Sequence, residues 1–268
     1  MNRRDPSQSA VKCDALIRRA ARAVLVSLAT MNIVFVGGCD SPTEPEPVVP
    51  GTYMVSESHL YWSQTTADGI DRLIGAIRTA DGTVVAVTDL ATAPDGSLYA
   101  VSLSQLYRIN SGTAVATPIG AGLPDRTNAL CFNAAGELFA ATANTGTLYR
   151  IDPANGGFTP IGSYGSSWLS SGDLVFRPDG VLLATMARPG DNYDALATVN
   201  QATGAATVIR QDLPDQMYGL RLLDGVIYGC AAADRGLYVI NGTTGAFVRV
   251  RTLSFAPYGS KSSDVARP

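Results

Sequence analysis

Histidine is almost absent from this sequence, because His59 is the only one among 268 residues. A hydrolase or lyase built on a histidine base would have to use it. His59 follows Glu57 and Ser58 in a tight turn between two predicted strands, where a solvated polar residue is the simpler interpretation. The chain also has no phosphate-binding loop, no metal-spaced Cys/His pair and no dinucleotide-binding glycine pattern. The sequence therefore carries no motif for nucleotide or zinc chemistry.

Positive charge is scarce beyond residue 38. Residues 1–38 hold six Lys/Arg and two Asp/Glu, which leaves 14 basic and 21 acidic side chains, a net charge of −7, in residues 39–268. We expect no nucleic-acid partner for such an acidic chain, and no attraction to anionic lipid headgroups. The length from residue 51 onward is ordinary for a single all-β domain with one substantial core.

The apolar run near the start is too short to span a bilayer comfortably. It covers the 14 residues Ala23–Val36 and follows Arg18, Arg19 and Arg22, an arrangement typical of an export signal. It leads into Val36-Gly37-Gly38-Cys39, which resembles the bacterial lipobox: an aliphatic residue, two small residues and an obligate cysteine. An ordinary secretory signal with an incidental cysteine is the alternative interpretation.

The lipobox resemblance implies how the protein is held. In that family the cysteine thiol receives a diacylglycerol and the signal peptide is removed before it. We therefore expect a signal peptide at residues 1–38, a lipid on Cys39 and a location in the bacterial cell envelope, on the periplasmic side of the inner or outer membrane or at the cell surface. Residues 39–50 are acidic and rich in proline, which favours an extended tether of up to ~35 Å at about 3.1 Å per residue. The globular domain is expected at residues 51–268.

Sustained helical periodicity is also missing, and an internal repeat takes its place. The turn glycines Gly96, Gly136, Gly180 and Gly225 are 40, 44 and 45 residues apart. Each unit predicts four short strands, and the first strand ends in a turn such as Pro94–Gly96. Four-stranded units at this period are typical of β-propeller blades, with a stacked solenoid as the alternative.

The two ends of the domain favour a closed ring. Residues Gly51–Trp62 match strands two and three of a unit, and Ile70–Ile77 would supply its fourth strand. Its first strand is missing there, but Ser263–Pro268 resembles Gly172–Pro178, the first strand of another unit. We therefore predict an all-β, five-bladed propeller of four-stranded antiparallel blades. Pairing of the C-terminal strand with the N-terminal blade would close it.

The repeats resemble those of bacterial NHL, YVTN and gluconolactonase-like propellers. The resemblance rests on units such as "DLATAPDGSLYAVSLSQLYRIN" from Asp89 and covers almost all of residues 51–268. It implies the fold and leaves function open, because propellers host many unrelated activities. Gluconolactonase-like enzymes need a glutamate among their metal ligands, and no glutamate begins an innermost strand here. That activity is therefore not transferred from the resemblance.

Three aspartates occupy the same place at the start of predicted innermost strands: Asp89, Asp173 and Asp264. Five-fold geometry would aim them at the mouth of the central channel, where they suit a divalent cation such as calcium or ligand hydroxyls. The alternative is that each one caps backbone N–H groups of a neighbouring loop. No other cofactor is expected.

Function is expected on the face that carries the longer and more varied loops, here called the loop face. The opposite face carries the Asp-Gly turns, is called the turn face, and is expected to be structural. Trp168, Tyr218 and Tyr258 lie in or beside loops of the loop face. Aromatic side chains there would stack on sugars or anchor a protein partner, or they would pack between blades.

Two cysteines remain in the predicted domain. The repeat alignment puts Cys131 on the innermost strand of the third blade and Cys230 on the second strand of the fifth. A whole blade would separate them, whereas a disulfide needs Cα atoms within about 7 Å. We therefore expect two buried free thiols.

The sequence favours a non-catalytic binding or scaffolding propeller, anchored by lipid in the envelope, with a protein or carbohydrate ligand. A metal-assisted hydrolase or lactonase-type enzyme that uses the three aspartates is one alternative, and a lectin-like binder of envelope polysaccharide is the other. No catalytic residue is predicted.

Overall fold

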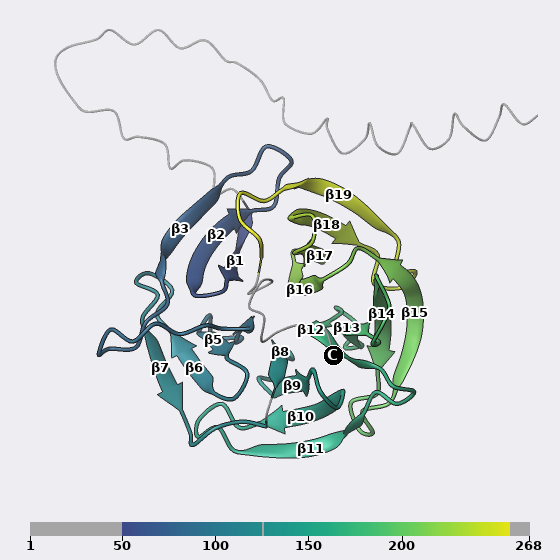
Figure 1. The fold of residues 1–268 in the computed structure, drawn as a ribbon, viewed down its shortest axis with the longest axis horizontal. Helices are drawn as coiled ribbons and strands as arrows, with labels where there is room; N and C mark the ends of the chain where they lie inside the picture. Colours follow the sequence, from purple (N-terminus) through teal and green to yellow (C-terminus); the bar gives the residue numbers. More distant parts are fainter. Residues whose placement is uncertain (1–49, 125, 258–268) are drawn as a thin grey trace, which may run out of the picture. The chain divides into compact units, whose positions relative to one another are not determined.

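The structure of the protein is a computed structural model that describes residues 50–124 and 126–257. Within these ranges the chain forms 19 β-strands in five antiparallel sheets, arranged around a common centre (Figure 1). The predicted all-β, five-bladed propeller is confirmed. In the same ranges, no helix has the length and apolar character needed to cross a membrane.

The described strands form one blade of three strands and four blades of four strands. The first blade comprises β1 (Gly51–Ser56), β2 (His59–Gln64) and β3 (Asp71–Ala76), and the second comprises β4 (Asp89–Thr92), β5 (Leu98–Val101), β6 (Leu106–Ile109) and β7 (Ala116–Ile119). The third comprises β8 (Thr127–Phe132), β9 (Leu138–Thr142), β10 (Thr147–Ile151) and β11 (Phe158–Ser163). The fourth comprises β12 (Leu169–Phe176), β13 (Leu182–Ala187), β14 (Asp194–Val199) and β15 (Ala206–Leu213), and the fifth comprises β16 (Met217–Leu223), β17 (Val226–Ala231), β18 (Gly236–Ile240) and β19 (Phe247–Thr252).

Strands within each blade pair in chain order. The innermost described strands of the four-stranded blades are therefore β4, β8, β12 and β16, and the outermost are β7, β11, β15 and β19 (Figure 1). Burial follows this order, because Leu182–Ala187 of β13 is buried throughout, whereas β11 at the rim is exposed or half-buried. The innermost strands thus bring residues that are 40 or more positions apart to one centre.

The turn after each innermost strand has the predicted chemistry. Gly96, Gly136, Gly180 and Gly225 have φ of +82°, +82°, +81° and +79°, in the left-handed region that glycine adopts without a steric penalty. In the first of these turns the Asp95 side chain accepts a hydrogen bond from the Ser97 N–H at 2.9 Å. Such local bonds fix the hairpin that joins the first and second strands of a blade.

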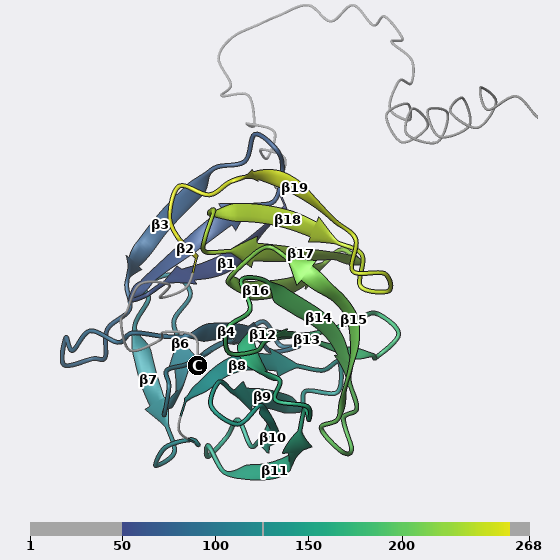
Figure 2. The ribbon, with the colours of Figure 1, turned by 45° about the vertical axis from the view of Figure 1, so that its right-hand side comes forward.

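Each neighbouring pair of blades shares its own apolar core. The clusters centre on Leu60 with Leu98, Leu106 with Leu138, Phe139 with Phe176, Leu183 with Ile227, and Met54 with Leu237. The last cluster joins the fifth blade to the first, which lie next to each other in Figures 1 and 2. Burial of one such aliphatic side chain stabilises the fold by about 1.5–3 kcal/mol, so the stacked blades hold one another in place.

The first blade differs from the others. The predicted fourth strand at Ile70–Ile77 is present as β3, and β1 pairs with β2 from Gly51 with Gln64 to Ser56 with His59. The strand predicted to pair with β1, Ser263–Pro268, lies outside the described residues, as do Tyr258, Asp264 and residues 1–49 with Cys39.

Candidate functional site

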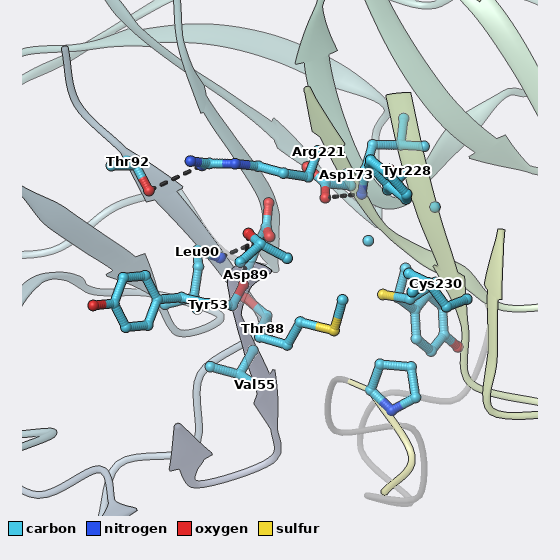
Figure 3. Close-up of a pocket in the computed structure, with 18 of the residues that line it drawn as sticks. Tyr53, Val55, Thr88, Asp89, Leu90, Thr92, Asp173, Arg221, Tyr228 and Cys230 are labelled. Carbon is cyan, nitrogen blue, oxygen red and sulfur yellow. Dashed lines mark hydrogen bonds between the residues drawn. The ribbon is translucent and has the colours of Figure 1, made fainter. Parts of the chain in front are cut away.

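Asp89 lies at the start of β4, buried at the centre of the ring. Its Oδ1 accepts the N–H of Leu90 at 2.7 Å, and its Oδ2 accepts the N–H of Leu130 at 2.6 Å. Leu130 belongs to β8, the innermost strand of the next blade. The carboxyl group of Asp89 therefore ties two neighbouring innermost strands together through their backbones, and Figure 3 shows the bond to Leu90.

Asp173 repeats this arrangement two blades further on, although it lies within β12 and not at the start of the innermost strand as predicted. Its Oδ1 accepts the N–H of Leu174 at 2.5 Å, and its Oδ2 accepts a short hydrogen bond from the N–H of Leu220 on β16. Asp89 and Asp173 thus satisfy backbone donors in the way that the capping interpretation expected. Among the described residues, no cluster of three or more His, Cys, Asp or Glu side chains could hold a metal ion.

The two carboxyl groups lie within hydrogen-bonding reach of each other. Burial raises the pKa of Asp89 well above its usual value, and the nearby charge of Asp173 raises it further. Burial also raises the pKa of Asp173, against the opposing effect of the N–H donor of Leu220. The pair therefore retains a proton at a pH where an exposed aspartate is ionised.

Arg221 reaches across the centre from β16 to β4. Its Nη1 donates to Oγ1 of Thr92 at 2.9 Å (Figure 3), whereas its Nε is buried and donates to none of the described residues. Burial lowers the pKa of Arg221, and the charge of Asp173 opposes that change. The guanidinium is still charged at neutral pH, because an arginine pKa starts above 12. It is the cation of the central site.

Two cavities meet at Arg221 and Thr92. The central cavity, of about 60 Å³, lies between β1, β4, β16 and β17 and is lined by Asp89, Asp173 and Cys230. The turn-face cavity, of about 680 Å³, lies among the ends of β4, β8, β12 and β16 beside the turns at Pro94 and Pro178. The larger cavity therefore lies on the face that the sequence predicted to be structural.

The aromatic residues predicted for ligand binding are buried where the structure describes them. Trp168 is 6% exposed, with the guanidinium of Arg188 at 4.2 Å from the centroid of its ring. Tyr218 is 5% exposed and packs against Gly172. Trp168 packs in the core shared by the third and fourth blades, whereas Tyr218 is buried beside the central cavity and helps to line it.

Cys131 and Cys230 are free and buried, on β8 and β17 as predicted. The fourth blade separates their two blades along one side of the ring. Burial raises the pKa of both thiols, and the charges of Asp173 and Asp89 add to the effect. Because the thiolate is the reactive form, both cysteines are protected against modification in the folded chain.

Sequence reasoning missed Arg221, although the repeats carry a signal for it. Arg221 stands two positions after Gly219, and the equivalent places in the other repeats are Ala91, Cys131 and Val175. A single arginine where the other units have small or apolar residues marks a position with a special role. Thr92, its partner, has no comparable signal, because the contact joins residues 129 positions apart.

The chain is similar in structure to proteins of several kinds. No protein-family model and no curated protein matches it. A structure from work on the de novo evolutionary emergence of a symmetrical protein aligns with a TM-score of 0.52 and 18% identity, over 75% of this chain and 92% of that one. An auxiliary nutrient binding protein from Bacteroides thetaiotaomicron aligns with a TM-score of 0.47 and 15% identity. The alignment covers 75% of this chain and 56% of that one. A virginiamycin B lyase from Staphylococcus aureus aligns with a TM-score of 0.45 and 15% identity, over 82% of this chain and 72% of that one.

These likenesses concern shape, because identities of 15–18% are too low to transfer an activity. The alignment with a TM-score of 0.52 supports the fold alone, which the structure itself shows to be a five-bladed β-propeller.

Proposed function

We propose that this protein is a non-catalytic binding or scaffolding propeller that a lipid on Cys39 holds in the bacterial cell envelope. The order of basic residues, apolar run and Val36–Cys39 supports the anchor, because export and lipidation require that order. The acidic, proline-rich residues 40–50 support a tether between the lipid and the propeller. The membrane is then the first partner, and a ligand of the propeller is the second.

The hydrogen bonds that Asp89 and Asp173 accept favour binding over catalysis. Each carboxyl group accepts two backbone N–H groups, one from its own strand and one from the next blade. A metal ion or a substrate hydroxyl would have to share each oxygen with a backbone donor, because these bonds take up one of the two acceptor sites on every oxygen of the two carboxyl groups. The two side chains are therefore assigned to holding the ring together.

The second candidate is the metal-assisted hydrolase, and the raised pKa values of the same two residues support proton transfer by them in such an enzyme, not metal binding. Carboxyl groups with strongly perturbed pKa values beside a cavity are typical of catalytic acids and bases as well as of structural networks. The lectin-like alternative has less support, since Trp168 and Tyr218 are buried.

An assay with calcium and a simple lactone separates the two candidates. The purified full chain in mild detergent should hydrolyse gluconolactone at the uncatalysed rate. Its melting temperature should be the same with calcium as with a chelator. If calcium bound the native state, it would raise the melting temperature. Calcium-dependent hydrolysis that is lost in Asp173→Asn and kept in the control Asp95→Asn, in an exposed turn, would overturn the binding assignment in favour of the enzyme.

A further inference from the structure

The turn-face cavity has the size of a small-molecule site. Its volume of about 680 Å³ falls within the roughly 300–1,000 Å³ typical of ligand pockets. Residues from four different blades line it, so its shape is set by the packing of the whole ring. Such a cavity is preformed and needs no loop movement to accept a ligand.

The wall of this cavity is mainly apolar. Apolar residues of the innermost strands contribute to it, among them Leu90, Phe132 and Leu222, whereas Leu130 and Leu174 also line it but are only 1% exposed. A wall of this kind gains free energy by removing the apolar part of a ligand from water. It therefore suits a ligand that has a hydrocarbon or aromatic body.

The charged side chains of the cavity are of one sign. Arg177 and Arg221 line it, and no carboxylate is among the described residues that do so. Arg177 is already engaged, through an ion pair with Asp179 and a hydrogen bond of 3.4 Å to the carbonyl oxygen of Gly242. Arg221 is the cation whose hydrogen-bonding capacity is not used up.

Arg221 keeps unused N–H donors because Asp173, the acid whose charge acts on it, accepts none of them. The oxygens of Asp173 accept the N–H groups of Leu174 and Leu220, so Asp173 offsets the charge of Arg221 through space alone. Within the described residues the guanidinium donates one hydrogen bond, to Thr92, which holds it at the junction of the two cavities. Its Nε also has no acceptor among the described residues, but it is buried, so an acceptor from outside would meet the Nη groups of the fork.

We infer that the turn-face cavity binds a small organic anion, with a carboxylate on Arg221 and an apolar body against the leucine and phenylalanine wall. A carboxylate matches the planar fork of N–H donors that a guanidinium presents. Thr92 acts as a positioning residue that keeps the fork aimed at the cavity. This inference rests on the proposed function, since it names the class of ligand that the binding module takes.

Equilibrium dialysis of the full chain against radiolabelled benzoate tests the inference, with benzamide as the neutral probe of the same shape and a detergent-only chamber as the blank. Benzoate should bind at millimolar concentration, and benzamide should bind at least about tenfold more weakly, because it lacks the negative charge and the second acceptor oxygen that pair with a guanidinium. Arg221→Met should weaken benzoate binding by a similar factor. The matched control is Arg108→Met, because Arg108 lies outside the cavity and contacts Ser97 and the ring of Tyr99. It should leave binding unchanged.

Thr92→Val gives a second test that does not depend on Arg221→Met being folded. Valine has the shape of threonine without the hydroxyl group, so this variant should fold with a slightly lower melting temperature, because Arg221 loses an acceptor, and should bind benzoate several-fold more weakly. Equal binding of benzoate and benzamide, or benzoate binding that Arg221→Met and Thr92→Val leave unchanged, would overturn the inference. Failure of benzoate to bind, with no calcium-dependent hydrolysis, would reject this ligand class and leave the proposed binding module in place.

Discussion

Arg251 holds Asp71 across the seam between the fifth and the first blade. Nη1 of Arg251, on β19, donates to Oδ2 of Asp71 at 3.1 Å, and Nη2 donates a short hydrogen bond to Oδ1. Nη2 also donates to the carbonyl oxygen of Gln64 at 2.9 Å, and the N–H of Ser254 donates to Asp71 at 2.7 Å. The side chains of Arg251 and Asp71 are only 7% and 1% exposed. The ion pair therefore joins the two ends of the described ring.

Removing the acid from this buried pair should destabilise the ring. We expect Asp71→Asn to lower the free energy of unfolding by about 3–5 kcal/mol, because it leaves the buried charge of Arg251 uncompensated. Urea denaturation measures the change. The control is Asp212→Asn, which removes an ion pair with Arg210 at the surface and should leave the midpoint nearly unchanged. Equal midpoints for wild type and Asp71→Asn would show that the pair does not stabilise the seam.

The same pair should affect stability at acid pH. Burial alone would raise the pKa of Asp71, but the hydrogen bonds from Arg251 and Ser254 outweigh it and hold the pKa below the usual range. A depressed pKa contributes stability above the unfolded value of about 3.9, and this contribution is lost as the pH falls through the folded pKa. Urea midpoints below pH 4 should therefore fall more steeply for wild type than for Asp71→Asn. Parallel curves would contradict this assignment.

Asp89 should have the opposite effect on the pH dependence of stability. Its pKa is raised by burial and by Asp173, so the native state keeps a proton that the unfolded chain releases. Between about pH 4, near the unfolded pKa, and the higher folded pKa, stability should fall as the pH rises. Asp89→Asn should flatten this part of the urea midpoint curve, whatever its effect on absolute stability. A slope that is unchanged in Asp89→Asn would assign the titration to other groups.

The fold was largely predictable from sequence because it is periodic. Gly96, Gly136, Gly180 and Gly225 mark turns that need positive φ, and local chemistry repeats wherever the turn repeats. The site was less predictable, because it depends on what crosses between blades. Arg251 and Asp71 are 180 positions apart and belong to no repeat pattern, so nothing local marks them as partners.

Whether a predicted site residue can bind a ligand or packs between blades depends on its burial. The repeat pattern does not indicate burial. Trp168 directly precedes β12. A residue at this place can lie in an open loop or in an interface between blades. The structure buries Trp168 in the core shared by the third and fourth blades. The position of Asp89 was predicted correctly, but whether its carboxyl faced a cation or a backbone depended on the amide of Leu130 in the next blade.

The two thiols should resist modification in the folded protein. Burial raises the pKa values of Cys131 and Cys230, so little thiolate is present at neutral pH. Iodoacetamide should leave both residues unmodified in the native chain and label both after unfolding without a reductant, as read by peptide mass spectrometry. If neither were labelled after unfolding, the two cysteines would be bridged and their separate blades would be wrong.

Closure of the first blade by the end of the chain also stays a prediction. Among the described residues β1 pairs with β2 alone, so its other edge is available for Ser263–Pro268. Deletion of these six residues should expose a sheet edge and lower the soluble yield through aggregation. Val265→Pro should have a similar effect, because proline cannot donate to a strand ladder. A truncated protein with the melting temperature of the parent would reject closure by this segment.

The intact mass of the protein extracted from membranes tests the proposed anchor and location most directly. We expect a chain that begins at Cys39 and carries the added mass of a diacylglycerol and, where the amine is acylated, of a further acyl chain. Cys39→Ser should lack this mass and leave the membrane fraction. A membrane-bound chain that still contains residues 1–38, or a Cys39→Ser variant that sediments with membranes after a salt wash, would contradict the lipid anchor.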